Sequence, residues 1–104
     1  MQSKACEAAG FLKILANDRR LMILCELLKG ERSVSELEAV VGLSQSALSQ
    51  HLARLRESRI VQTRRESHMI YYRIADPGVS KIVGTLYSLY CSEEAARKTE
   101  RKRK

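Results

Sequence analysis

The chain has 104 residues, a formal net charge of +7 and three cysteines. This length allows one domain with a modest core. Because such a core would gain from burial against a second copy, we expect a homodimer. No apolar run reaches membrane-spanning length and the N-terminus lacks the layout of a secretion signal, which excludes membrane and secreted classes and predicts a cytoplasmic protein. The odd cysteine count without disulfide-scaffold spacing fits that reducing compartment.

Two helices are expected in the first third of the chain. Small and apolar residues at helical spacing predict the first over 3–16, a composition that permits close approach to another helix. The Asn-Asp pair at 17–18 supplies a stop and an N-cap, and a second helix follows over 19–29, ended by Gly30. Its predicted apolar stripe, which directs a cysteine toward the core, consists of Leu21, Leu24, Cys25 and Leu28.

A short third helix is indicated by two overlapping Ser-x-x-Glu capping boxes. Ser33 pairs with Glu36 in one, and Ser35 pairs with Glu38 in the other. We expect the helix to begin near Ser35 and to stop at Gly42.

The next helix, capped by Ser44, combines an apolar seam with an unusual outer face. Leu48, Leu52 and Leu55 recur at helical spacing and predict the side that packs on the core. A helix that only needed solubility would usually carry Glu and Lys pairs on its other side, whereas short hydroxyls, amides and an arginine can hydrogen-bond base edges and phosphates. Two helices separated by a short glycine-containing turn form a helix-turn-helix. The outer face carries Gln45, Ser46, Ser49, Gln50, Ala53 and Arg54.

A β-hairpin follows this helix. Residues 60–66 and 69–74 are rich in β-branched and aromatic residues and predict two strands, with Ser67 and His68 at the tip. A hairpin directly after a recognition helix is a wing, so the predicted fold is mainly α with a β-hairpin wing: a winged helix-turn-helix with five helices. The alternating apolar positions of the second strand are Ile70, Tyr72 and Ile74.

The start of the last helix is predicted by its N-cap residues. Asp76 followed by Pro77 is typical of a helix start, and Cys91 lies at the expected end. The predicted domain therefore covers 1–92, and 93–104 is expected to be a basic, disordered tail. The apolar side of the last helix is predicted to comprise Val79, Ile82, Val83, Leu86 and Tyr90.

Positive charge is concentrated in two segments. Positions 97–104 hold six basic residues and one acidic residue, so most of the net charge of +7 belongs to the tail. Within the domain, positions 54–73 hold six arginines and two glutamates. This second cluster adjoins the proposed reading helix and favours contact with phosphates.

Four sequence segments carry a family resemblance that extends to the end of the predicted domain. They are Leu-Ala-Asn-Asp-Arg-Arg-Leu-Met-Ile-Leu-Cys (15–25), Ser-Gln-Ser-Ala-Leu-Ser-Gln-His-Leu-Ala-Arg-Leu-Arg (44–56), Ile-Tyr-Tyr-Arg (70–73) and Leu-Tyr-Ser-Leu-Tyr-Cys (86–91). Together they resemble the ArsR family of dimeric winged-helix repressors. The resemblance implies operator DNA as the partner, no enzymatic activity, and a homodimer formed through the first and last helices.

Two cysteines narrow the resemblance. Cys25 ends Ile-Leu-Cys and Cys91 ends Leu-Tyr-Cys, a combination that resembles the branch of the family comprising BigR, SqrR, YgaV and HlyU. This resemblance implies a dithiol that senses persulfides, sulfide or oxidants and releases operator DNA once it is crosslinked. By position alone, a cysteine on an apolar stripe is more often a small buried hydrophobe than a reactive thiol. Cys6 and the basic tail depart from the branch pattern and have no assigned role.

The candidate DNA-reading residues lie on the fourth helix and on the hairpin. A winged helix that binds only a protein partner is the alternative, and a steep loss of duplex affinity with salt would argue against it. We expect base contacts from Gln45, Ser46, Ser49 and Gln50, contacts with phosphates or the minor groove from Arg54, Arg64 and Arg65, and further DNA contacts from Ser44 and His51.

Metal-binding and enzymatic functions have less support. His51 and His68 lie in the reading helix and at the wing tip, so no metal site or cofactor is expected. A thiophilic metalloid such as arsenite or antimonite, held by Cys25 and Cys91 with or without Cys6, is the alternative inducer. A thiol oxidoreductase is disfavoured because the chain has no Cys-x-x-Cys and no strand–helix alternation.

Overall fold

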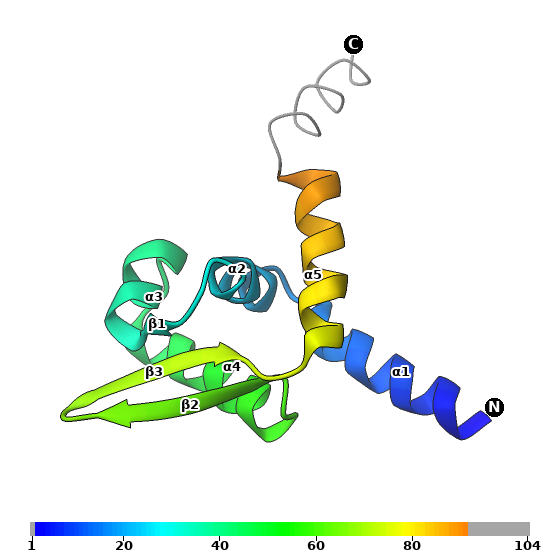
Figure 1. Cartoon of the computed structure of the whole chain (residues 1–104), viewed down its shortest axis with the longest axis horizontal. Coiled ribbons are helices and arrows are strands. Elements are labelled where there is room, and N and C mark those ends of the chain that lie inside the picture. Colours follow the sequence, from blue (N-terminus) through cyan, green and yellow to red (C-terminus); the bar gives the residue numbers. More distant parts are fainter. Residues whose placement is uncertain (1, 92–104) are drawn as a thin grey trace, which may run out of the picture.

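The computed structural model describes residues 2–91, which form five helices and one three-stranded antiparallel sheet (Figure 1). This arrangement confirms the predicted winged helix-turn-helix, while the expected tail at 93–104 lies outside the described residues. Within residues 2–91, every helix is too short or too polar to cross a membrane. The elements are α1 (Gln2–Leu15), α2 (Asp18–Leu27), β1 (Arg32–Ser33), α3 (Val34–Val41), α4 (Gln45–Glu57), β2 (Val61–Glu66), β3 (Met69–Ile74) and α5 (Pro77–Tyr90).

The core lies where α2, α3 and α4 meet the sheet. The predicted seam of α4 is confirmed, because Leu48, Leu52 and Leu55 are all buried. On α2 the predicted stripe is rotated: Ile23 and Leu27 are buried, whereas the expected Leu21, Cys25 and Leu28 are only partly buried against the core. The reason is that α2 contacts α1, α3, α4 and α5 together, so its buried face is wider than one stripe.

The helix starts resolve the alternatives that the sequence leaves open. Asn17 is the N-cap of α2 and its side chain accepts from the Arg20 N–H at 3.0 Å. In α3 the capping box is the one at Ser33, which accepts from the Glu36 N–H at 3.2 Å and donates its own N–H to the Glu36 carboxylate at 2.9 Å. The helix therefore begins at Val34, slightly before the expected start near Ser35.

The helix ends depend on left-handed backbone in two places. Gly42, with φ of 71°, ends α3 as predicted, and its N–H donates to the carbonyl of Glu38. The second helix stops at Leu27, two residues earlier than expected, and Gly30 follows with φ of 135°. Glycine adopts such angles without the steric penalty that a Cβ would bring.

The sheet contains one strand that sequence reasoning did not predict. β1 has only two residues, too few for an alternating pattern, and it pairs with β3 through Arg32 opposite Tyr72 and Ser33 opposite Tyr71. The strand order is β1-β3-β2. The hairpin of β2 and β3, which we call the wing, turns at Ser67 as predicted.

The last helix, α5, stands away from the body, and α1 extends from the same side of the molecule (Figure 1). The start of α5 is as predicted: the Asp76 side chain accepts from the Gly78 N–H at 2.8 Å, and a proline lies in the first turn. Only Val79 and Val83 of its predicted apolar side are buried. Ile82 is 38% exposed and Tyr90 is 72% exposed, so the outer half of α5 offers apolar surface to solvent in a single copy.

Candidate nucleic-acid interface and thiol pocket

The solvent-facing side of α4 carries the polar side chains that the sequence predicts there. Its leucine seam holds the helix on the core, and the Ser44 hydroxyl caps it by accepting from the Ala47 N–H at 3.2 Å. Because the caps and the seam fix the helix, the polar face is presented as a rigid set. The exposed members are Ser44, Gln45, Ser46, Ser49, Gln50 and Arg54.

A hollow of about 480 Å³ lies between α4 and the wing. Gln45, Ser49 and Arg56 line it from α4, and His68 lines it from the wing tip. The polar, solvent-facing side of α4 and the wing tip therefore border one concave surface. Arg56 was not among the predicted DNA contacts. Its place in the basic cluster at 54–73 is the sequence signal that could have made it a candidate.

His51 is placed differently from the rest of the predicted set. Its side chain is half-buried, and its Nδ1 lies 3.4 Å from Nη1 of Arg20 on α2. The same arginine donates from Nε to the carbonyl of Ile14, at 2.6 Å. This placement favours a contact between α4 and the α1–α2 junction over the expected contact with DNA.

The two adjacent arginines of β2 lie on opposite faces of the wing. Side chains alternate along a strand, so Arg65 shares a face with buried Val61 while Arg64 lies on the other face. Arg64 is engaged by the carboxylates of Glu31 and Glu66. Among the described residues Arg65 has no ion-pair partner.

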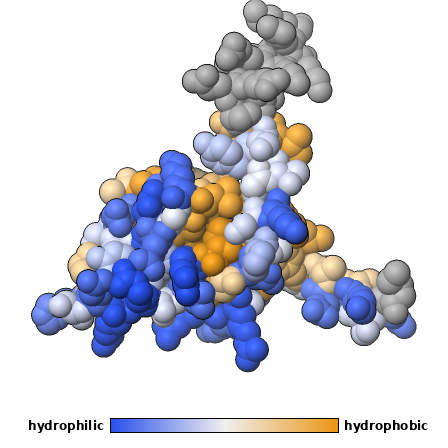
Figure 2. Space-filling model, in the orientation of Figure 1, coloured by the Kyte–Doolittle hydropathy of each residue, from blue (hydrophilic) through white to orange (hydrophobic). Residues whose placement is uncertain are grey.

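A second hollow, of about 360 Å³, lies between α2 and α5 and contains both predicted sensor cysteines. Cys25 lines it from α2 and is partly buried, whereas Cys91 caps the end of α5 and is exposed. Figure 2 shows hydrophobic surface in this part of the molecule and polar surface over the wing. We call this hollow the thiol pocket. Its apolar lining includes Leu21, Met22, Val40, Leu86, Tyr87 and Tyr90.

The surroundings of Cys25 disfavour its thiolate. Burial raises the pKa of the Cys25 thiol, the neighbouring Cys91 and Glu26 raise it further, and Lys29 lowers it. The contribution from Cys91 is consistent with its place in the same pocket as Cys25. Cys6 is exposed on α1 and is not part of the pocket lining.

Nowhere in 2–91 do three His, Cys, Asp or Glu side chains gather closely enough to hold a metal ion. Cys25, Glu26 and Cys91 all line the thiol pocket, but they do not form such a group.

A capped helix with a polar outer face, set across a hollow from a β-hairpin, defines a winged-helix protein of the DNA-binding class. Residues 17–63 match the family described as bacterial regulatory protein, arsR family. Together with the relatives below, this match shows that the chain belongs to the ArsR family.

The relatives support the same assignment along most of the chain. The biofilm growth-associated repressor of Xylella fastidiosa is 45% identical over 94 residues, which cover 90% of this chain and 82% of that protein. The structure of reduced HlyU from Vibrio cholerae N16961 has a TM-score of 0.85 and 46% identity, covering 88% of this chain and 97% of that one. The structure of the AntR antimony-specific transcriptional repressor has a TM-score of 0.81 and 37% identity, covering 93% and 86%.

These findings confirm the predicted family and the resemblance to the branch that includes BigR and HlyU. They establish a DNA-binding transcriptional regulator of the ArsR family, and not an enzyme.

Proposed function

We propose that this chain is a cytoplasmic transcriptional repressor that releases operator DNA when Cys25 and Cys91 are linked by reactive sulfur. One observation carries the proposal: two cysteines far apart in the sequence line a single apolar pocket between α2 and α5. The X. fastidiosa relative named as a repressor supports the direction of regulation.

In the proposed complex, α4 enters the major groove. Its exposed amides and hydroxyls reach base edges, and exposed arginines meet phosphates on either side. The hollow beside the wing supports this role, because residues of α4 and of the wing tip line the same concave surface. The proposed base contacts are Gln45, Ser46, Ser49 and Gln50, and the proposed phosphate contacts are Ser44, Arg54 and Arg65.

The proposed chemistry begins at the more accessible thiol. The exposed Cys91 takes a sulfur atom from a low-molecular-weight persulfide and releases the corresponding thiol, and Cys25 then reacts in the same way. Attack of one protein persulfide on the other forms a trisulfide and expels hydrogen sulfide, which balances both sulfur and hydrogen. Each inserted sulfur extends the reach of the bridge by roughly 2 Å beyond that of a disulfide.

The proposed link would act through the dimer. A bridge between Cys25 and Cys91 ties α2 to α5, and α5 with α1 carries the exposed apolar surface that we assign to the homodimer interface. Two recognition helices must meet half-sites about 34 Å apart, so a small change in how α5 sits on the body weakens binding to both at once.

Intact-protein mass spectrometry combined with duplex binding tests the proposal. After treatment with glutathione persulfide, the wild-type chain should gain one sulfur atom, lose two hydrogens and release a duplex selected from a random pool. Cys25→Ser and Cys91→Ser should stay bound under the same treatment, and Cys6→Ser is the matched control that should respond like the wild type. Release of DNA by either of the first two variants would contradict the two-thiol switch.

A metalloid-responsive repressor is the second candidate. The structural similarity to an antimony-specific repressor and the pair of thiols in one pocket favour it. In the same binding assay, antimonite or arsenite should then release the duplex while persulfide does not, and the loss of either pocket cysteine should abolish the response.

A further inference from the structure

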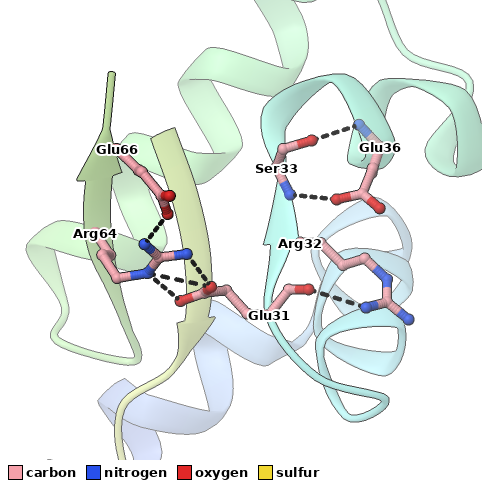
Figure 3. Close-up of polar contacts among 6 residues, drawn as sticks. All are labelled: Glu31, Arg32, Ser33, Glu36, Arg64 and Glu66. Carbon is pink, nitrogen blue, oxygen red and sulfur yellow. Dashed lines mark hydrogen bonds and ion pairs between the residues drawn. The ribbon is translucent and has the colours of Figure 1, made fainter. Parts of the chain in front are cut away.

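One arginine of the wing, Arg64, forms an ion pair with the segment that directly precedes β1. The Arg64 guanidinium donates from Nη2 to Glu31 Oε1 at 2.7 Å and from Nε to both oxygens of the same carboxylate, at 3.2 and 3.1 Å. Its remaining nitrogen, Nη1, donates to Glu66 on the same strand. Figure 3 shows the guanidinium between the two carboxylates. Every nitrogen of the side chain therefore has a carboxylate partner.

This contact crosses the whole sheet. Arg64 lies opposite Tyr71 of β3, and its guanidinium carbon is 4.6 Å from the centre of that ring. Glu31 directly precedes β1, which pairs with the other side of β3. The arginine thus passes over the middle strand and fastens the outer strand of the wing to the segment between α2 and α3.

The charges around Arg64 make it a poor ligand for phosphate. Two carboxylates face the Arg64 guanidinium, and Arg73 is a second cation that acts on Glu31, so the positive charge of Arg64 is already neutralised by its neighbours. Hydrogen bonding to Arg64 lowers the pKa of Glu31, which keeps that carboxylate ionised. A phosphate would have to displace a planar, forked ion pair, which is the favoured geometry for an arginine and a carboxylate. Arg65, on the opposite face, meets no such competition.

We propose that Glu31 and Arg64 position the wing, and that Arg65 rather than Arg64 is the arginine of β2 that binds a DNA phosphate. This inference rests on the proposed DNA-reading function. It makes Glu31 a positioning residue for DNA binding although it is acidic and lies outside both the recognition helix and the wing.

The two readings of Arg64 make opposite predictions for Glu31→Gln. If Arg64 were a phosphate ligand, removing the competing carboxylate would release it and tighten binding. If the pair positions the wing, the same substitution weakens binding despite raising the net charge of the protein. Charge alone therefore cannot produce the expected result.

The experiment measures affinity against salt for the full chain and a duplex selected from a random pool. Glu31→Gln and Arg64→Gln should each weaken binding about two- to fivefold and leave the salt slope unchanged, and the double variant should bind no more weakly than Arg64→Gln. Arg65→Gln should lower the slope by about 1.8, because the proposed homodimer loses one phosphate contact of about 0.9 in each half-site. Without DNA, hydrogen exchange should accelerate in β2 and β3 of Glu31→Gln and Arg64→Gln but not in their α4. In Arg65→Gln, hydrogen exchange should match that of the wild type throughout.

Tighter binding by Glu31→Gln, or a slope lowered by about 1.8 in Arg64→Gln, would overturn the positioning role. Those outcomes leave the proposed function intact, because the wild-type chain would still bind the duplex with a steep salt dependence. Failure of the wild-type chain to bind any duplex in a salt-dependent way would overturn the proposed function, and this inference with it.

Discussion

Cys25 is a residue whose reactivity is set by its neighbours. Burial, Cys91 and Glu26 raise the pKa of its thiol while Lys29 lowers it, so the thiolate fraction at neutral pH is smaller than that of a free cysteine. In a Cys6→Ser/Cys91→Ser background, the rate of alkylation by iodoacetamide should still be rising at pH 9, the ordinary value for the group. Lys29→Gln should slow the reaction at neutral pH, and Glu26→Gln should accelerate it. A rate that levels off well below pH 9 would show that the pocket activates the thiol instead.

Substitutions of Gln50 and Arg54 test which α4 side chains contact bases and which contact phosphates. Both side chains are exposed, one an amide suited to a base edge and the other a cation suited to phosphate. Gln50→Ala should reduce discrimination at one base pair of each half-site by about 1–3 kcal/mol. Arg54→Gln should weaken binding to all sequences and lower the salt slope by about 1.8, which is about 0.9 for each protomer of the proposed homodimer. Affinities for a panel of single-base operator variants separate the two outcomes. Uniform weakening by Gln50→Ala would assign that amide to the backbone.

At the scale of elements, the start of α3 provides a matched pair of serines. Ser33 is buried and exchanges two hydrogen bonds with Glu36, as Figure 3 shows, whereas Ser35 is exposed within the helix. Ser33→Ala should destabilise the fold by about 1 kcal/mol, and Ser35→Ala should change the free energy of unfolding by less than about 0.5 kcal/mol. Urea denaturation gives both values. Equal effects would mean that the capping box contributes little.

The same elements show where a periodic pattern is sufficient and where it is not. The α4 seam was predicted correctly because that helix packs on one side only, which leaves the other side for polar residues. The α2 stripe was predicted with the wrong centre because neighbours on several sides bury Ile23 and Leu27 as well. β1 escaped prediction altogether, since its pairing depends on Tyr71 and Tyr72, far away in the sequence.

At the scale of the whole molecule, the exposed apolar residues of α1 and α5 predict the homodimer. Leu12 is 54% exposed, Leu89 58% and Tyr90 72%, a surface that a second copy would cover. Leu89→Glu should shift the protein from dimer to monomer in sedimentation velocity and reduce operator affinity at least tenfold, because two half-sites would no longer be bound together. Met69→Glu, which alters an equally apolar side chain that is 40% exposed on the wing, is the control for oligomeric state. A dimer that survives Leu89→Glu would place the interface elsewhere.

Local sequence determined the helix-turn-helix, the wing and the polar reading face, because caps, turns and apolar periodicity act over a few neighbouring residues. Tertiary structure decided what depends on segments that are distant along the chain. It brought Cys25 and Cys91 into one pocket, turned His51 toward Arg20, and bound Arg64 to Glu31. The sequence could nominate each of these side chains by its chemistry, but the partner that defines its role is supplied only by the packing of α2, α5 and the sheet.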